Sequence, residues 1–225
     1  MKYSSPYVPP TLTVDAVIFQ LVDDVLSVLL VQRINNPFKG VWALPGGYNP
    51  QGETTVAALQ RIVNYKAGVD IKRDLSYLEQ LYTFDTVSRD PRGHAVSVTY
   101  MGCGRNVTPK PSEYPAQFFP VSKLPDLAYD HADIIHYAHK RLIAKLTYTN
   151  AVYAFLPPRF TLTELQTAYE AIFGYTLDKR NFRKKFLSLG LTEETDEMRR
   201  DGAHRPARVH KFHSQSLQTL SRSFE

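Results

Sequence analysis

Apolar and polar residues alternate with two different periods along the chain. Residues 11–33, "TLTVDAVIFQLVDDVLSVLLVQR", hold two runs of β-branched and aliphatic residues joined by the polar "VDD", which is typical of two adjacent strands. Further strand-like runs follow at residues 77–87, 94–103 and 117–125. These runs predict a β-rich N-terminal domain.

Two segments of the same region have helical character. Residues 54–68 contain no helix breaker before Gly68, which predicts one helix with this glycine at its C-terminal end. Residues 129–148, "YDHADIIHYAHKRLIAKLTY", lack Pro and Gly and predict a helix that closes the domain, with Asp130 as its N-cap.

The pair of prolines in "NAVYAFLPPRF" marks a boundary, so we expect one domain over residues 1–150 and a second over residues 151–225. In the second, Thr161 and Glu164 have the spacing of a capping box, ahead of apolar residues at helical spacing. A further helix is expected over residues 178–190.

Composition adds few constraints. With 43% hydrophobic and 22% charged residues, the chain is typical of folded globular proteins rather than disordered ones. A single cysteine, Cys103, excludes a disulfide within the chain, and the apolar runs are too short to cross a bilayer. We therefore expect a cytoplasmic protein without membrane association.

The net charge of +5 is unevenly placed. Residues 151–225 hold 12 basic and 9 acidic residues, against 15 and 13 in the much longer first part. This bias permits binding of a polyanion without showing it.

The helix "DKRNFRKKFLSLG" has two different faces. Phe182, Phe186 and Leu189 share one face, whereas Arg180 and Lys184 point the opposite way. Such a cationic face suits phosphate contacts and base edges, although a solvated helix face explains a charge run equally well. The candidate DNA-binding residues of this helix are Lys179, Arg180, Asn181, Arg183 and Lys184.

The segment after this helix, "LTEETDEMRRDGAHRPARVHKF", is the second part of the DNA-binding prediction. Its Asp201-Gly202 pair is a hairpin turn signal, and the strands on either side would form a wing. Helix, basic helix and hairpin in this order are typical of a winged helix-turn-helix, which places its second helix in the major groove of double-stranded DNA. The candidate wing residues are Arg199, Arg200, Arg205 and Arg208.

The stretch "GGYNPQGETTVAALQRIVNYKAGV" resembles the Nudix box. The matching positions are Gly47, Glu53, Arg61, Val63, Gly68 and Val69. In Nudix hydrolases the helix of this box carries clustered glutamates that bind Mg²⁺ or Mn²⁺ and help to activate water. Those positions hold Ile62, Tyr65 and Lys66 in this sequence.

The replacement by Lys66 opposes metal binding. A unit charge about 4 Å from a divalent cation, at an effective dielectric constant of about 20, is repelled by about 8 kcal/mol. No pair among the seven histidines has convincing metal-ligand spacing. We therefore expect no metal site and no catalytic residues, with an active enzyme that takes its metal ligands from elsewhere as the alternative.

Over residues 10–212 the chain resembles the Nudix-related transcriptional regulators. The resemblance implies an α+β protein with an N-terminal Nudix α/β/α sandwich and a C-terminal winged helix-turn-helix. "SRDPRG" matches a segment near the family's ligand pocket, and Trp42 could line that cleft or belong to the core. The candidate ligand-binding residues are Arg33, Phe38, Trp42, Gly46, Gly47, Glu53, Arg61, Arg89, Asp90, Arg92 and His131.

This resemblance implies a homodimeric regulator that binds operator DNA and senses a small metabolite, with no cofactor. The expected effector is ADP-ribose or a related NAD metabolite, or else a sugar. Two alternatives stay open: a Nudix hydrolase of ADP-ribose or a similar diphosphate, and an interaction module whose basic helix contacts an acidic protein.

Overall fold

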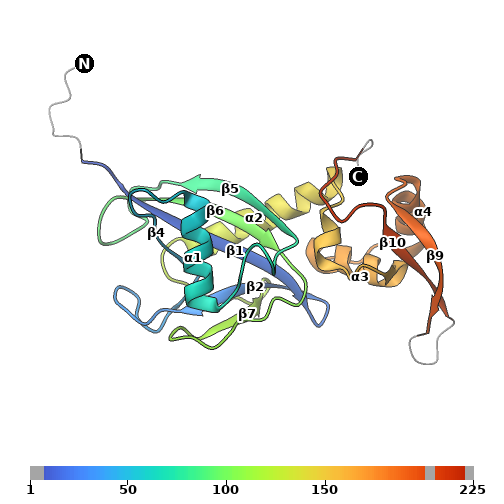
Figure 1. The fold of residues 1–225 in the computed structure, drawn as a ribbon, viewed down its shortest axis with the longest axis horizontal. Coiled ribbons are helices and arrows are strands. Elements are labelled where there is room, and N and C mark those ends of the chain that lie inside the picture. Colours follow the sequence, from blue (N-terminus) through green and yellow to red (C-terminus); the bar gives the residue numbers. More distant parts are fainter. Residues whose placement is uncertain (1–7, 201–205, 221–225) are drawn as a thin grey trace, which may run out of the picture.

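The computed structural model describes residues 8–200 and 206–220 (Figure 1). The Asp201-Gly202 turn and Arg205 therefore lie outside the described residues. The described chain forms a large N-terminal part, built on a sheet with one helix on each face, and a smaller C-terminal part.

The large sheet has seven strands in the order β3-β2-β1-β6-β5, with β4 paired to β1 and β7 paired to β2. The central pair, β1 and β6, is parallel, and the other pairs are antiparallel. The strands are β1 (Thr11–Val22), β2 (Val25–Gln32), β3 (Trp42–Ala43), β4 (Gly46–Tyr48), β5 (Tyr77–Phe84), β6 (Ala95–Cys103) and β7 (Ala116–Pro120).

Alternation along β1 gives the sheet two apolar faces. Ala16 and Ile18 pack in one cluster with α1 (Thr55–Ala67), whereas Val17 and Phe19 pack in another with α2 (His131–Tyr148). Side chains that alternate along a strand point to opposite faces, so one strand serves both cores. This arrangement confirms the predicted α/β/α sandwich.

The sequence predicts the residues that end α1 and begin α2, but only the first of them acts as expected. Gly68 ends α1 in the left-handed conformation, with φ of 64°, as expected. Asp130 occupies the N-cap position of α2, as predicted, but its side chain makes no capping hydrogen bond. Its carboxylate instead accepts two hydrogen bonds from the Arg89 guanidinium, a stronger partner than a backbone N–H.

The C-terminal part is a helix-turn-helix followed by a hairpin. Thr161 and Glu164 form the predicted capping box, and Asp178 caps the second helix through the Asn181 N–H. These features confirm the winged helix-turn-helix. Its elements are η1 (Ala151–Phe155), β8 (Phe160–Thr161), α3 (Leu162–Phe173), α4 (Lys179–Ser188), β9 (Thr192–Arg199) and β10 (Ala207–Phe212), with the strands in the order β8-β10-β9.

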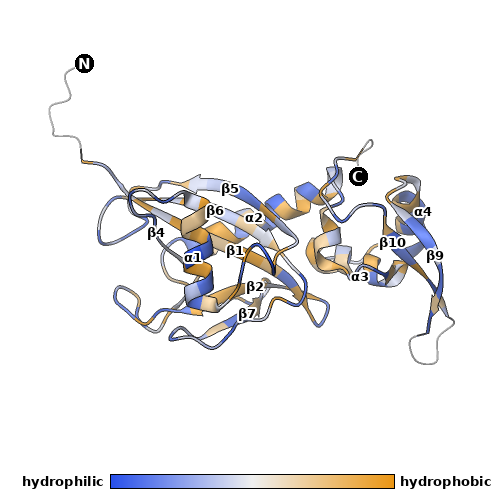
Figure 2. Cartoon of the chain, in the orientation of Figure 1, coloured by the Kyte–Doolittle hydropathy of each residue, from blue (hydrophilic) through white to orange (hydrophobic). Residues whose placement is uncertain are grey.

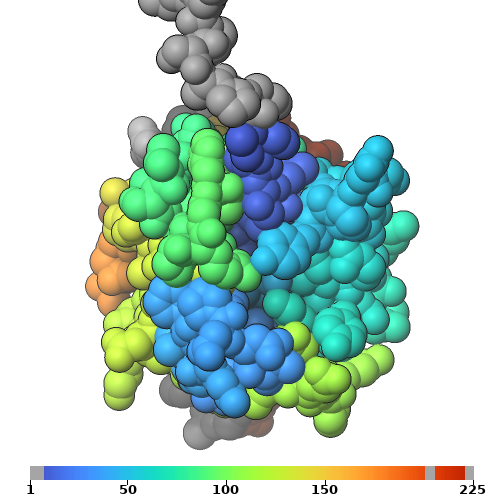
Figure 3. Space-filling view, turned by 90° about the vertical axis from the view of Figure 1, so that its left-hand side faces the viewer, coloured from blue at the N-terminus to red at the C-terminus, as the bar shows by residue number. Residues whose placement is uncertain are grey.

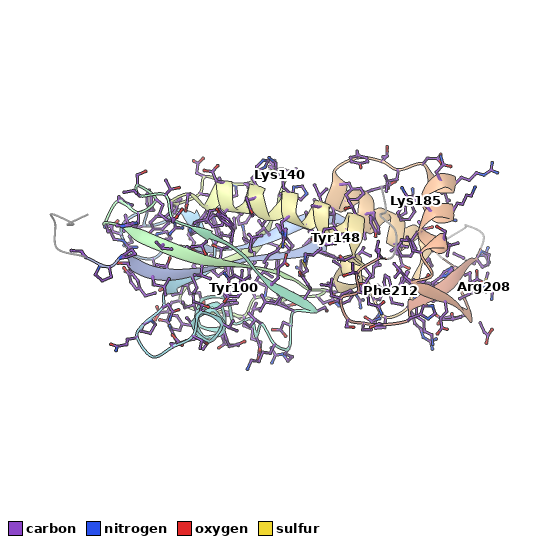
Figure 4. The ribbon with its side chains drawn as sticks, turned by 90° about the horizontal axis from the view of Figure 1, so that it is seen from above. Tyr100, Lys140, Tyr148, Lys185, Arg208 and Phe212 are labelled. Carbon is purple, nitrogen blue, oxygen red and sulfur yellow. The ribbon has the colours of Figure 1, made fainter. Side chains whose placement is uncertain are left out.

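One apolar cluster continues from the α2 face of the large sheet through η1 to α3 and α4. At this junction His139 Nε2 lies 2.6 Å from the Ile172 carbonyl oxygen, and the Tyr153 hydroxyl donates to the Ser76 carbonyl at 2.9 Å. Figure 4 shows α2 running along the sheet, with Tyr148 near its C-terminal end. The proposed boundary at residue 150 falls between α2 and η1.

The most hydrophobic strands are those in the middle of the sandwich, between the two helices. Orange dominates along β1 and β2 in Figure 2, whereas β9 is mostly blue. Among the described residues, no helix combines the length and the apolar character needed to cross a membrane.

Phe186 generates a test of the C-terminal core. Its ring is fully buried against Tyr169, Phe182 and Phe212. Phe186→Ala should lower the free energy of unfolding by about 3–5 kcal/mol, because removal of the ring leaves a cavity. Urea unfolding measures it, with Leu187→Ala, on an exposed position of the same helix, as the control. Equal effects of the two changes would contradict this packing.

Candidate functional site

A cavity of about 470 Å³ opens at one end of the N-terminal part, where β1, β4, α1, the loop after β2 and the start of α2 meet. Its volume is within the range of small-molecule sites. Figure 3 looks onto this end of the molecule, where the blue, cyan and green segments adjoin. The predicted ligand residues that line the cavity are Arg33, Gly46, Gly47, Arg61, Arg89, Asp90, Arg92 and His131.

Three predicted ligand residues do not line this cavity. Trp42 packs edge-on against Phe119, with 4.7 Å between ring centroids, beside the core of the α2 face. Phe38 lies behind the cavity wall against Tyr129, at 4.9 Å. Glu53 forms an ion pair with Arg61 at 2.7 Å and so orients a lining side chain.

Asp15 is the buried centre of the site. It is the single acid in the apolar run of β1, and it accepts a hydrogen bond from the Ser97 hydroxyl at 2.5 Å. The Arg89 guanidinium lies 3.6 Å away and His131 Nε2 lies 3.7 Å away. A Cβ on Gly46 would overlap the Asp15 carboxylate, so the close approach of β4 requires glycine there.

His131 connects the start of α2 to this centre. Its Nδ1 accepts a hydrogen bond from the Leu44 N–H at 2.9 Å, so a neutral ring carries its proton on Nε2, toward Asp15. Burial lowers the pKa of His131, although the nearby Asp15 carboxylate acts in the opposite direction. The imidazole is therefore neutral at pH 7.

Aromatic rings and guanidinium groups form the outer wall. Arg33 lies over the Tyr129 ring at 4.9 Å, and Arg92 lies over the Tyr48 ring at 5.6 Å. Arg92 is also held by two hydrogen bonds to the Asp90 carboxylate, at 3.0 and 2.6 Å. Such a wall offers flat faces for a base and cations for phosphate.

Several lining residues are absent from the set that the sequence predicts: Asp15, Tyr48, Lys66, Tyr114 and Tyr129. A lone acid in an apolar strand is a signal for Asp15, and Tyr48 and Lys66 lie within the box itself. Tyr114 has no comparable signal, because only the folded chain brings it to the cavity.

The residues present do not fit a divalent cation. Lys66, at a box position where hydrolases have a glutamate, donates a hydrogen bond to the Gly46 carbonyl at 2.6 Å. Within the described parts of the chain, no group of three or more His, Cys, Asp or Glu side chains could hold a metal. At this position the positive charge comes from the Lys66 ammonium group and not from a metal ion.

The second candidate site is the outer face of α4. The side chains of Lys179, Arg180, Asn181 and Lys184 are exposed there, while Phe182 and Phe186 fix the opposite face in the core. Figure 4 places Lys185 and Arg208 at the outer end of the molecule.

Arg183 differs from these neighbours. It donates a hydrogen bond to the Thr163 hydroxyl at 2.9 Å and thereby joins α4 to the first turn of α3. Its guanidinium is therefore already engaged within the winged helix.

The wing is less cationic than the sequence suggests. Arg199 donates to both Glu164 oxygens, at 3.0 and 3.1 Å, and so joins β9 to α3. Arg208 lies 3.7 Å from Glu194 and donates to the Thr195 carbonyl, whereas Arg200 is exposed. Among the acids of β9, in "TEETDEMR", Glu194 lies against Arg208 and Glu193 pairs with Lys211.

Comparison with known proteins places both parts in one family. A model of the NUDIX domain matches residues 10–138, and a model described as the NrtR DNA-binding winged helix domain matches residues 152–212. The ADPR responsive transcriptional repressor NtrR of Acinetobacter baylyi is 38% identical over 219 residues, covering 92% of this chain and 84% of the relative. The chain belongs to the NrtR family.

Solved structures agree with this family membership. NrtR from Shewanella oneidensis, complexed with a 27mer DNA, is 31% identical with a TM-score of 0.77, covering 95% of this chain and 99% of that one. Its NUDIX domain complexed with ADP ribose is 35% identical with a TM-score of 0.54, covering 60% and 90%. The ADP-ribose pyrophosphatase of Methanocaldococcus jannaschii is 36% identical, covering 57% of this chain and 73% of the relative.

The buried histidine of this NrtR-family chain generates a pH prediction. Because burial lowers the pKa of His131, the unfolded chain takes up the proton first as the pH falls. The free energy of unfolding should be fully retained above about pH 6.5, the value of an unfolded histidine, and decrease below it. Denaturant unfolding over this range measures the slope.

His131→Asn should reduce that slope, and His136→Asn, at an exposed position of the same helix, should leave it unchanged. An unaltered slope in His131→Asn would contradict a neutral buried imidazole.

Proposed function

We propose that the protein is a transcriptional repressor that binds operator DNA through α4 and responds to ADP-ribose in the Nudix cavity. The observation that carries this proposal is the match to an ADPR responsive repressor over both parts of the chain, 92% of its length. The side chains that line the cavity and those on the outer face of α4 support the proposal independently of this match.

The cavity has the chemistry of a nucleoside diphosphate site. Tyr48 and Tyr129 offer flat aromatic faces for an adenine, and Arg33, beside Tyr129, offers a cation for a phosphate. The NUDIX domain of Shewanella NrtR was solved with ADP ribose, which supports the same effector here in preference to a sugar.

The winged helix has the geometry of a DNA reader. Phe182 and Phe186 hold α4 so that Lys179, Arg180 and Lys184 project outward, free to contact phosphates and base edges. We infer a homodimer, because such modules read two half-sites through two-fold symmetry. We also infer a cytoplasmic protein that needs no cofactor.

The helix α2 supplies a route between the two sites. It begins at His131 in the cavity and contacts α3 through His139, whose ring lies 2.6 Å from the Ile172 carbonyl. A ligand that favours one position of α2 would change the placement of the winged helix.

A hydrolase is the second candidate, favoured by the match to an archaeal ADP-ribose pyrophosphatase. Lys66 and the absence of a metal-ligand cluster in the described residues argue against it. We propose that the cavity binds ADP-ribose without cleaving it. Product release from ADP-ribose with Mg²⁺ or Mn²⁺ at a rate typical of enzymes would overturn this.

DNA binding tests the placement of α4. Arg180→Ala with Lys184→Ala should weaken binding to the protein's own promoter region and reduce the salt slope by about 2, one for each phosphate that is no longer neutralised. Lys123→Ala with Lys140→Ala removes the same charge from exposed positions of the Nudix domain and should leave both values unchanged. Fluorescence anisotropy at several salt concentrations measures them.

If the two double variants behaved alike, α4 would not be the DNA-binding helix. Arg199→Ala is informative beside them. Because this side chain joins β9 to α3, its removal should lower the thermal stability of the winged helix as well as its affinity for DNA.

The effector response is tested in the same assay. Added ADP-ribose should shift the DNA affinity of the wild-type protein, whereas ribose 5-phosphate at equal concentration should have a smaller effect because it lacks the adenine and the diphosphate. An identical DNA affinity with and without ADP-ribose would overturn the proposed effector.

A further inference from the structure

Five cations line the cavity, and three of them are neutralised by neighbouring carboxylates. Those three are Arg61 with Glu53, Arg89 with Asp130 and Asp15, and Arg92 with Asp90. The remaining two are Arg33 and Lys66. Neither forms an ion pair with a carboxylate in the described parts of the chain.

Neutral backbone oxygens hold these two side chains in place. Arg33 donates from Nε to the Pro37 carbonyl at 2.8 Å, and Lys66 donates to the Gly46 carbonyl at 2.6 Å. The Lys66 ammonium also lies over the Tyr114 ring at 5.1 Å. Carbonyl and ring contacts fix a cation without cancelling its charge, and both groups keep further N–H donors for a ligand.

The cavity itself disfavours the Lys66 charge in the absence of a ligand. Burial lowers the pKa of Lys66, and the Arg33 charge lowers it further, against the opposing pull of Asp15. An anion beside both groups would remove their mutual repulsion and replace the hydration that burial takes from Lys66. The diphosphate of a nucleoside diphosphate ester carries two negative charges, which matches two unpaired cations.

Lys66 also occupies a position of the Nudix box at which hydrolases have a metal-binding glutamate. In the Nudix box a glutamate at this place helps to hold a divalent cation, whose charge would face a bound diphosphate. An ammonium at the same place faces the cavity with a positive charge of its own.

We propose that Lys66 and Arg33 form a clamp that binds the diphosphate of the effector without a divalent cation. This inference rests on the proposed function, because it takes a nucleoside diphosphate derivative as the ligand. Lys66 provides the charge that a hydrolase takes from its metal.

The experiment is calorimetric titration of the full chain with ADP-ribose, once with excess EDTA and once with excess Mg²⁺. The wild-type protein should bind equally well in both. Lys66→Met and Arg33→Gln should each weaken binding about tenfold or more, the range expected when a charge-assisted hydrogen bond is removed. Lys66→Arg should retain much of the affinity, and Lys72→Met, at an exposed position outside the cavity, should match the wild type.

The variant Lys66→Glu tests directly whether the charge at this position decides the need for a divalent cation. This variant should bind ADP-ribose poorly in EDTA and regain affinity with Mg²⁺, because a carboxylate faces the diphosphate in place of an ammonium. A thermal unfolding midpoint within a few degrees of the wild type in each variant controls for folding.

Binding by the wild type that requires Mg²⁺, or undiminished binding by Lys66→Met, would overturn the clamp and leave the repressor proposal standing. Failure of the wild type to bind ADP-ribose under either condition would overturn the effector itself. Inorganic pyrophosphate then tests the clamp alone: binding in EDTA that Lys66→Met abolishes would support it, and no binding would overturn it.

Discussion

The buried charge cluster around Asp15 holds the Nudix cavity together. Arg89 lies between Asp15 and Asp130 and pairs with both. A neutral His131, which accepts a hydrogen bond from the Leu44 N–H, completes the group. Removing one member of such a cluster leaves an uncompensated buried charge, at a cost of about 3–5 kcal/mol. Because these residues come from β1, the loop after β5 and the start of α2, the cluster fixes the elements whose side chains line the cavity.

The same cluster sets the position of α2, whose other end belongs to the core shared with the winged helix. His131 lies in its first turn, and the apolar side from Ile135 to Leu146 continues the cluster that reaches α3 and α4. A well-packed core responds to a shift at one end by moving as a unit. The helix thus connects the chemistry of the cavity with the placement of the DNA-binding surface.

The sequence predicts correctly those features of the fold that depend on interactions between residues close together in the chain. The left-handed Gly68, the Thr161 capping box and the two apolar periods depend on neighbours a few residues away, and each is found where expected. The side-chain pairings that the sequence does not predict depend on distant partners. The Asp130 carboxylate pairs with Arg89 and makes no capping bond, and Arg199 on β9 pairs with Glu164 on α3. Neither partner can be inferred from spacing.

The Nudix fold owes its enzymatic use to carboxylates that bring a metal to a phosphate, and this chain keeps the frame around that place. Gly46, Gly47 and the Glu53–Arg61 pair shape the loop and the helix start, whatever charge lies beyond them. An ammonium at Lys66 can attract a phosphate but cannot lower the pKa of a water molecule as a divalent cation does. This difference, together with Ile62 and Tyr65 at the other two glutamate positions of the box, is the basis of our proposal that the cavity binds its ligand without cleaving it, as a sensor requires.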